Sequence, residues 1–74
     1  MARPISKIAA DIRNDWKKPY FGAVPYLEAM AELNSIDDQY MYDTGRSVVL
    51  YFLSNASTWR GPVARSVKAE LKAL

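Results

Sequence analysis

The sequence has 74 residues, of which ten are basic and eight acidic, and it contains neither histidine nor cysteine. Disulfides, thiolate nucleophiles and metal sites built from cysteine or histidine are therefore excluded, together with mechanisms that need an imidazole base. Asp37, Asp38 and Asp43 form an acidic cluster, but they lack the alternating ligands and the glycine of a calcium loop. We expect a protein that is not an enzyme, has no small-molecule substrate and needs neither metal nor cofactor.

Half of the residues are hydrophobic and 24% are charged, which is the balance of a folded domain. The longest uninterrupted apolar run, 48–53, has six residues, whereas a membrane span needs about 20. The first residues lack the apolar stretch of a secretory signal. We expect a single domain over residues 1–74, located in the cytoplasm and not bound to a membrane.

Charge is distributed unevenly along the chain. Residues 1–19 include five basic and two acidic residues, residues 20–45 include five acidic and no basic ones, and residues 46–74 include five basic residues and one acidic one. Either these segments neutralise one another and form solvated faces, or they produce a dipolar surface that steers partners.

A first helix is predicted over 4–18. Its apolar residues recur at about 3.6 residues per turn along a single stripe, formed by Ile5, Ile8, Ala9, Ile12 and Trp16. Pro4 suits the first helical turn, and Pro19 ends the helix at Lys18.

A second helix is predicted over 24–34. Proline is tolerated at the start of a helix, so Pro25 marks the beginning, and Asn34 is a suitable end. The inner face consists of Val24, Leu27, Met30 and Ala31, and the outer face of Glu28 and Glu32. The segment from Ser35 to Asp38 has the spacing of a capping box, which predicts a short helical turn through Tyr40.

A third helix is predicted over 44–57, with Asp43 or Thr44 as its N-cap. A helical wheel places Val48, Val49, Phe52, Leu53 and Ala56 on the inner side and Ser47, Tyr51, Ser54, Asn55 and Thr58 on the outer side. The same apolar run has high β propensity. The sequence offers no second strand-like run to pair with it, so a helix is favoured.

The last helix is predicted over 62–73, after Gly61. Its inner stripe is Val63, Ala64, Val67, Leu71 and Leu74, and its outer stripe is Arg65, Lys68 and Lys72. The prediction is an all-α fold, a compact bundle of three to four short helices.

The third helix suggests a partner surface, because residues 47–59 carry no charge. It is either the central helix, covered on both sides, or a helix whose polar face binds a second copy or a partner. Trp16, Phe52 and Trp59 are assigned to the core. Five further aromatic residues gather near the breaks between helices, where partial exposure suits partner contacts or packing at the hinges: Tyr20, Phe21, Tyr26, Tyr40 and Tyr42.

The candidate partner-binding residues are Tyr20, Tyr26, Tyr40, Tyr42, Ser47, Tyr51, Ser54 and Asn55, with Phe21 beside them. Oligomerisation is also favoured by chain length, because a core this small barely offsets the conformational entropy lost on folding. We expect a homo-oligomer.

DNA binding is the alternative. The third helix, a turn at Gly61 and a basic last helix have the outline of a helix-turn-helix, with Arg60, Arg65, Lys68 and Lys72 as the candidate nucleic-acid residues. The start of that last helix lacks the side chains that read base edges, which favours non-specific phosphate contacts over sequence-specific binding. Arg3, Lys7, Lys17 and Lys18 add to such a surface only if the fold brings the termini together.

From Tyr20 to Leu74 the chain resembles small uncharacterised proteins of bacteriophages infecting actinobacteria. The resemblance is carried by residues 23–30, 35–38, 46–61 and the basic tail 63–74. It implies a small phage protein that acts inside the infected host cell and binds itself, a host protein or DNA. Together with the residues above, it leads to the expectation of a self-associating protein–protein interaction module that binds a host or phage protein.

Overall fold

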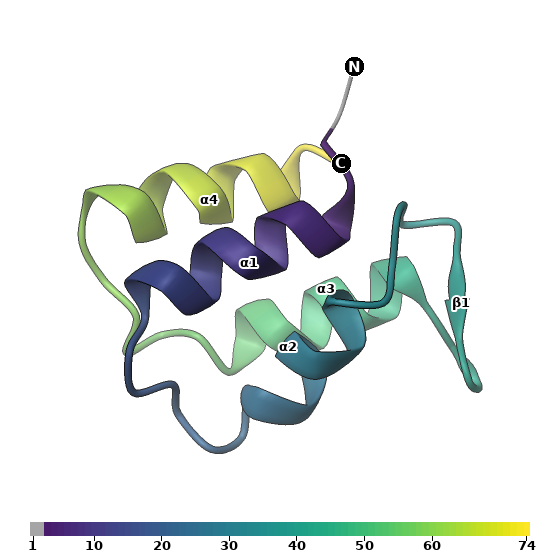
Figure 1. Cartoon of the computed structure of the whole chain (residues 1–74), viewed down its shortest axis with the longest axis horizontal. Helices are drawn as coiled ribbons and strands as arrows, with labels where there is room; N and C mark the ends of the chain where they lie inside the picture. The colour runs from purple at the N-terminus through teal and green to yellow at the C-terminus, as the bar shows by residue number, and fades with distance from the viewer. Residues whose placement is uncertain (1–2) are drawn as a thin grey trace.

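Residues 3–74, which the computed structural model describes, form four helices and one small hairpin (Figure 1). The elements follow in the order α1 (Ile5–Asp15), α2 (Val24–Met30), β1 (Gln39–Tyr40), β2 (Asp43–Thr44), α3 (Gly45–Ser54) and α4 (Pro62–Lys72). The predicted helical bundle is confirmed, with the hairpin as an addition.

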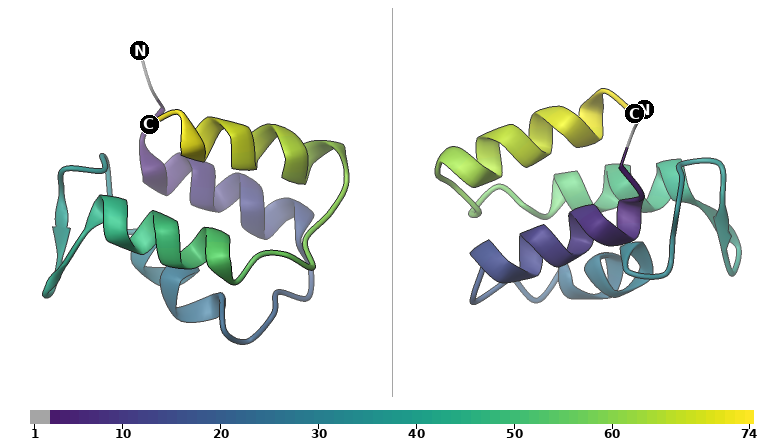
Figure 2. Two further views of the ribbon diagram at one scale, coloured as in Figure 1. Left: turned by 180° about the vertical axis from the view of Figure 1, so that it is seen from behind. Right: turned by 45° about the horizontal axis from the view of Figure 1, so that its top comes forward.

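The helices pack in a chain of neighbours. Helix α1 lies between α4 and α2, and α3 packs against α2. The view from behind shows α3 in front of part of α2 and nearer to the viewer than α1 (Figure 2). The connection that follows α1 and the connection that precedes α4 lie at one end of the bundle, and the hairpin projects at the other.

Helix α1 buries the predicted stripe: Ile5, Ile8, Ala9 and Ile12 are fully buried. The helix ends at Asp15 instead of Lys18. Trp16 already has an extended backbone, although its N–H still donates to the carbonyl of Ile12 at 2.7 Å. The helix ends early because the Trp16 ring turns inward and stacks on Trp59.

Helix α2 is shorter than predicted and ends at Met30 rather than near Asn34. After it, the N–H of Leu33 donates to the carbonyl of Met30 at 3.1 Å, which tightens the chain into a turn. The carbonyls of Leu33 and Asn34 then accept hydrogen bonds from the N–H groups of Ser6 and Ile5, at 2.7 and 3.1 Å. These bonds satisfy the start of α1, so tertiary pairing ends α2.

Two residues assigned to inner faces lie outside. Ala31 follows the end of α2 and is exposed, and Ala29 is buried in its place. Val63 is 41% exposed at the first turn of α4, although the next residue, Ala64, is buried. Both predictions were wrong because the helical periodicity was extended too far. Ala31 follows the last residue of α2, and Val63 lies about 100° around α4 from the buried Ala64, at the edge of the inner stripe.

The predicted helical turn through Tyr40 is also wrong. The Asp38 carboxylate accepts hydrogen bonds from the backbone N–H groups of Asn34 and Ser35, at 2.9 and 3.2 Å, and closes a turn instead of opening a helix. The chain then forms the antiparallel hairpin, in which Tyr40 pairs with Asp43. Met41 makes the reversal with a φ of 57°, a conformation that non-glycine residues adopt at a cost.

Helix α3 is a helix and not a strand, as predicted, and Thr44 is its N-cap. The Thr44 hydroxyl oxygen accepts a hydrogen bond from the N–H of Ser47 at 3.2 Å. The helix ends at Ser54, before the predicted 57. Val48, Val49 and Phe52 are buried, and Leu53 is half-buried.

Arg3 joins the start of the chain to α4. Its guanidinium binds both carboxylate oxygens of Glu70, at 2.8 and 2.9 Å, and Asp11 of α1 at 2.6 Å. The hydrogen bond from Arg3 is the main cause that lowers the pKa of Glu70 below its ordinary value. This ion-pair cluster holds α1 and α4 side by side near the C-terminus.

The three residues assigned to the aromatic core are buried. Trp16 and Trp59 stack with their ring centroids 5.7 Å apart, and both meet Phe52 in edge-on contacts at 6.3 and 6.5 Å. The indole Nε1–H of Trp59 donates to an Asp15 carboxylate oxygen at 2.8 Å. This cluster fixes the connection after α1 against the connection after α3.

Candidate functional site

An uncharged aromatic surface runs across the connection before α2 and the outer side of α3. Its centre is Gly22: a Cβ atom at this position would lie 2.6 Å from the Tyr20 ring and 2.9 Å from Oδ1 of Asn55. A glycine at this position therefore lets the two side chains approach each other without a shift. The Asn55 amide is fixed from the other side, because its Nδ2 donates to the carbonyl of Tyr51 at 2.8 Å.

The surface continues through paired rings. Tyr26 of α2 and Tyr51 of α3 stack with their centroids 5.4 Å apart, and Tyr51 remains 50% exposed. The Tyr20 and Phe21 rings are 4.8 Å apart, and Phe21 is 80% exposed. We name this set the aromatic surface: Tyr20, Phe21, Tyr26, Tyr51 and Asn55.

The hairpin tyrosines belong to a different region. Tyr40 is half-buried against the core, whereas Tyr42 is 100% exposed at the turn next to Met41. The hairpin leads into the start of α3, while Asn55 follows its end. Asn55 lies about 15 Å along the helix axis from the start of α3, and Tyr51 about 9 Å from it. The predicted tyrosines therefore form two groups.

The hydroxyl groups predicted for the same interface are engaged within the chain. The Ser47 hydroxyl oxygen accepts from the Thr44 hydroxyl at 3.2 Å, as part of the helix cap. Ser54 donates its hydroxyl to the carbonyl of Leu50 at 3.1 Å. Ser47 contributes to capping, and Ser54 is exposed with its donor already used. The polar face of α3 consequently offers fewer free groups than its composition suggests.

Leu50, 57% exposed on α3, was not singled out from the sequence. It lines a groove of about 120 Å³ between α3 and the end of α4, with Ile36 and Leu74 among the apolar residues and Arg46 and Lys72 as the basic ones. A helical wheel predicts the exposure of Leu50, because Leu50 lies about 160° around the helix from the buried Phe52.

The candidate nucleic-acid residues are divided between two places. Arg60, Arg65 and Lys68 line a recess of about 330 Å³ at the start of α4. Lys72 lines the groove near Leu50 instead. The connection between α3 and α4 spans 55–61, longer than the turn of about 3–4 residues in a helix-turn-helix, and α4 packs on α1. This arrangement differs from the helix-turn-helix outline.

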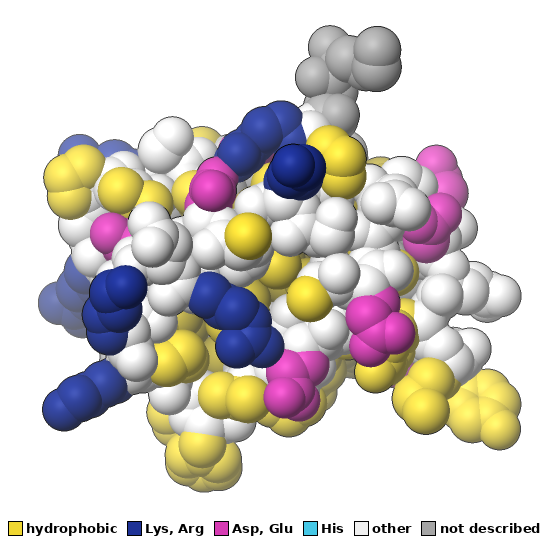
Figure 3. All heavy atoms as spheres, viewed as in Figure 1, with side chains coloured by type: hydrophobic (Ala, Val, Ile, Leu, Met, Phe, Trp, Pro, Cys, Tyr) yellow, Lys and Arg dark blue, Asp and Glu magenta, His cyan; other side chains and the backbone are white. Residues whose placement is uncertain are grey.

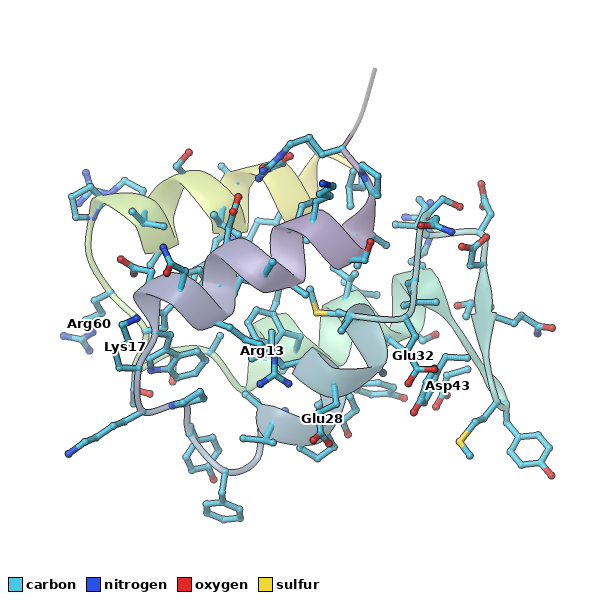
Figure 4. All side chains as sticks on the ribbon, in the orientation of Figure 1. Arg13, Lys17, Glu28, Glu32, Asp43 and Arg60 are labelled. Atoms are coloured by element: carbon cyan, nitrogen blue, oxygen red, sulfur yellow. The ribbon has the colours of Figure 1, made fainter. Side chains whose placement is uncertain are left out.

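Charge is segregated in space as well as along the chain. Lys17 and Arg60 lie next to the two connections at one end, whereas Glu28, Glu32 and Asp43 lie towards the hairpin (Figure 4). The space-filling view of the same face shows dark-blue side chains on the left, in the centre and at the top, and magenta ones on the right and in the lower centre as well as on the left (Figure 3). We name the residues around the two connections and the recess the basic end: Lys17, Lys18, Arg60, Arg65 and Lys68.

Comparisons with known proteins give no family assignment. No family model, curated protein or solved structure matches the sequence. Among residues 3–74, no helix has the length and apolar character needed to cross a bilayer.

Proposed function

We propose that the protein is a non-enzymatic protein–protein interaction module that associates with a second copy and with a host or phage protein through the aromatic surface. The phage setting rests on the sequence resemblance alone. The association rests on the exposure of Phe21 and Tyr51, 80% and 50%, at two ends of the connected set of uncharged side chains that form the aromatic surface.

The composition of this face supports the proposal. Interface centres are depleted in charged residues and enriched in tyrosine and other aromatic residues. Tyr20, Phe21, Tyr26 and Tyr51 provide large apolar area, and the Tyr hydroxyls and the Asn55 amide provide polar contacts at its edge. Aromatic side chains also lose little conformational entropy on binding, because they have few rotatable bonds.

Pre-organisation supports it further. The ring of Tyr51 is held by its stack on Tyr26, and Asn55 is held by its bond to the Tyr51 carbonyl. Groups already fixed in the free protein lose less entropy when a partner binds. The face is therefore suited to binding without rearrangement of α2 and α3.

The test is sedimentation velocity over a concentration series for the native chain and for Phe21→Ser and Tyr51→Ser. Loss of a central aromatic contact weakens an interface by about 2 kcal/mol or more, which corresponds to a Kd about 30-fold higher. Tyr42→Ser is the matched control, because Tyr42 is fully exposed on the hairpin. A native chain that stays monomeric at tens of micromolar removes self-association, and equal weakening by Tyr42→Ser moves the contact to the hairpin.

The partner protein is tested with a photo-cross-linking amino acid at position 51, compared with the same residue at position 42. A partner captured only from position 51, and competed by the unmodified protein, supports binding through the aromatic surface. Equal capture from both positions contradicts it.

A further inference from the structure

The basic end is assembled by the tryptophan stack. Lys17 directly follows Trp16 and Arg60 directly follows Trp59, and the two indole rings stack with their centroids 5.7 Å apart. The hydrogen bond from Trp59 to Asp15 adds a second link between the same two connections. Basic residues that lie more than 40 positions apart in the sequence are thereby held at one end of the fold (Figure 4).

The recess at this end carries positive charge without an acidic partner in its lining. Arg60, Arg65 and Lys68 line it, and none of the described residues that line it is acidic. The Lys68 ammonium donates one hydrogen bond to the carbonyl of Trp59 at 2.7 Å and retains two other donors. Burial, followed by the charges of Lys72 and Arg60, lowers the pKa of Lys68. The cations repel one another, so a bound anion would relieve the repulsion.

The positive charge of the basic end is largely uncompensated by acidic residues. Asp15 is the carboxylate nearest to it in the chain, and the Trp59 indole already occupies one of its oxygens. Glu70, the acidic residue of α4, is engaged by Arg3. The remaining cluster of Glu28, Glu32 and Asp43 lies towards the hairpin (Figure 4). A polyanion would therefore attract the basic end of the protein and repel the acidic end, and this fixes the orientation of the protein on the polyanion.

We propose that the basic end binds the phosphodiester backbone of nucleic acid without reading its sequence. Arginine and lysine side chains on the recess and on the adjoining connection contact successive phosphates. The first turn of α4 offers no polar side chain to base edges, because it begins with Pro62, Val63 and Ala64. Both tryptophan rings are buried and inaccessible for stacking on bases. This site is distinct from the aromatic surface and does not depend on self-association.

The experiment is fluorescence anisotropy of a labelled duplex and a labelled single strand of random sequence, titrated with the full chain at several salt concentrations. The affinity should fall linearly with salt on logarithmic axes, with a slope of about −0.9 per neutralised phosphate for the duplex. The variant Lys17→Glu/Arg60→Glu should weaken binding by about 10-fold or more at low salt. Both side chains are exposed, and circular dichroism verifies that the fold is retained.

The control is Arg46→Glu/Lys72→Glu, which makes the same charge change in the groove between α3 and the end of α4. Its effect should be several-fold smaller. Equal loss of binding by the two double variants would overturn the proposal, since only net charge would then matter. Retained binding by Lys17→Glu/Arg60→Glu would also overturn it. Equal affinity for polyglutamate of matched charge would assign the end to acidic proteins and not to nucleic acid.

The duplex and single-strand probes distinguish contact with the phosphate backbone from stacking on bases. The duplex presents paired phosphate backbones, and the single strand adds bases that can stack on exposed rings beyond the basic end. Comparable affinities that are unaffected by Phe21→Ser support backbone contact alone. A single-strand preference that disappears with Phe21→Ser would contradict it, because base stacking would then carry the binding.

Discussion

Replacement of Gly45 by alanine tests how α3 is attached to the loop before the hairpin. Gly45 is buried at the first position of α3. A Cβ atom there would lie 2.5 Å from the carbonyl oxygen of Ser35 and 2.9 Å from Cα of Ile36. Both neighbours are backbone atoms, which cannot rotate away as a side chain would.

Two opposing effects determine the result. Alanine is favoured over glycine within helices by up to about 1 kcal/mol. Against this, the loop must move by several tenths of an ångström, although it is held by bonds from the N–H of Gly45 to the Asp38 carbonyl at 2.6 Å and from the N–H of Arg46 to the Ile36 carbonyl at 2.9 Å. Overpacking costs about 1–3 kcal/mol, and strain in these bonds adds to it. The net expectation is destabilisation by about 1–2 kcal/mol.

The assay is thermal unfolding followed by circular dichroism. For a domain of this size, 1 kcal/mol shifts Tm by about 4–8 °C, so Gly45→Ala should lower Tm by about 5–15 °C. Ser66→Ala on the exposed side of α4 is the control for helix propensity and should leave Tm unchanged or slightly higher. If Gly45→Ala were as stable as the native chain, the close contact with the loop would be refuted.

Three further outcomes are expected. Arg3 lowers the pKa of Glu70 below its ordinary 4.5, so this pair stabilises the fold above that pH, and the stabilisation is lost as the pH falls through the lowered pKa. When Tm is measured from neutral to acidic pH, Glu70→Gln should therefore lose less of its Tm than the native chain. An unchanged acid profile would contradict the role of the pair. Met41→Gly should raise Tm by about 2–6 °C, because glycine adopts the φ of 57° at this exposed turn without strain. A lower Tm would show that the Met41 side chain contributes packing. Gly22→Ala should displace the Tyr20 ring and weaken self-association in sedimentation experiments while the helix signal in circular dichroism persists; unchanged association would separate Tyr20 from the interface.

The buried stripes were predictable because helical periodicity is a local property. Ile5, Ile8 and Ile12 are spaced for one face of a helix, and that face is the one that meets the rest of the protein. The N-cap at Thr44 followed from the same kind of local chemistry, a hydroxyl two or three residues ahead of free N–H groups.

The ends of the helices were less predictable because contacts between distant segments decide them. Trp16 leaves α1 to stack on a ring 43 positions later in the sequence. Helix α2 ends where the carbonyls of Leu33 and Asn34 bind the start of α1. The hairpin was missed for a related reason: Met41 occupies a positive-φ position that normally signals itself by glycine.

The sequence identified most members of the aromatic surface but not their grouping. Tyr20 and Asn55 are predicted residues, yet only the fold shows that both lie against Gly22. Tyr42 has the same composition signal and lies on the hairpin, where it is fully exposed. Residue type predicts which side chains suit a partner, whereas the placement of loops decides which of them form one surface.

The aromatic surface and the basic end depend on one structural feature, the contact between Trp16 and Trp59. The connection after Trp16 carries Lys17 and Lys18 and then Tyr20 and Phe21, so cations and exposed rings leave the core within a few residues of each other. A connection without regular secondary structure needs an anchor in the core to be rigid. The buried tryptophan pair provides that rigidity, which is why the charge and the aromatic area of this chain can be presented in fixed positions by a segment without regular secondary structure.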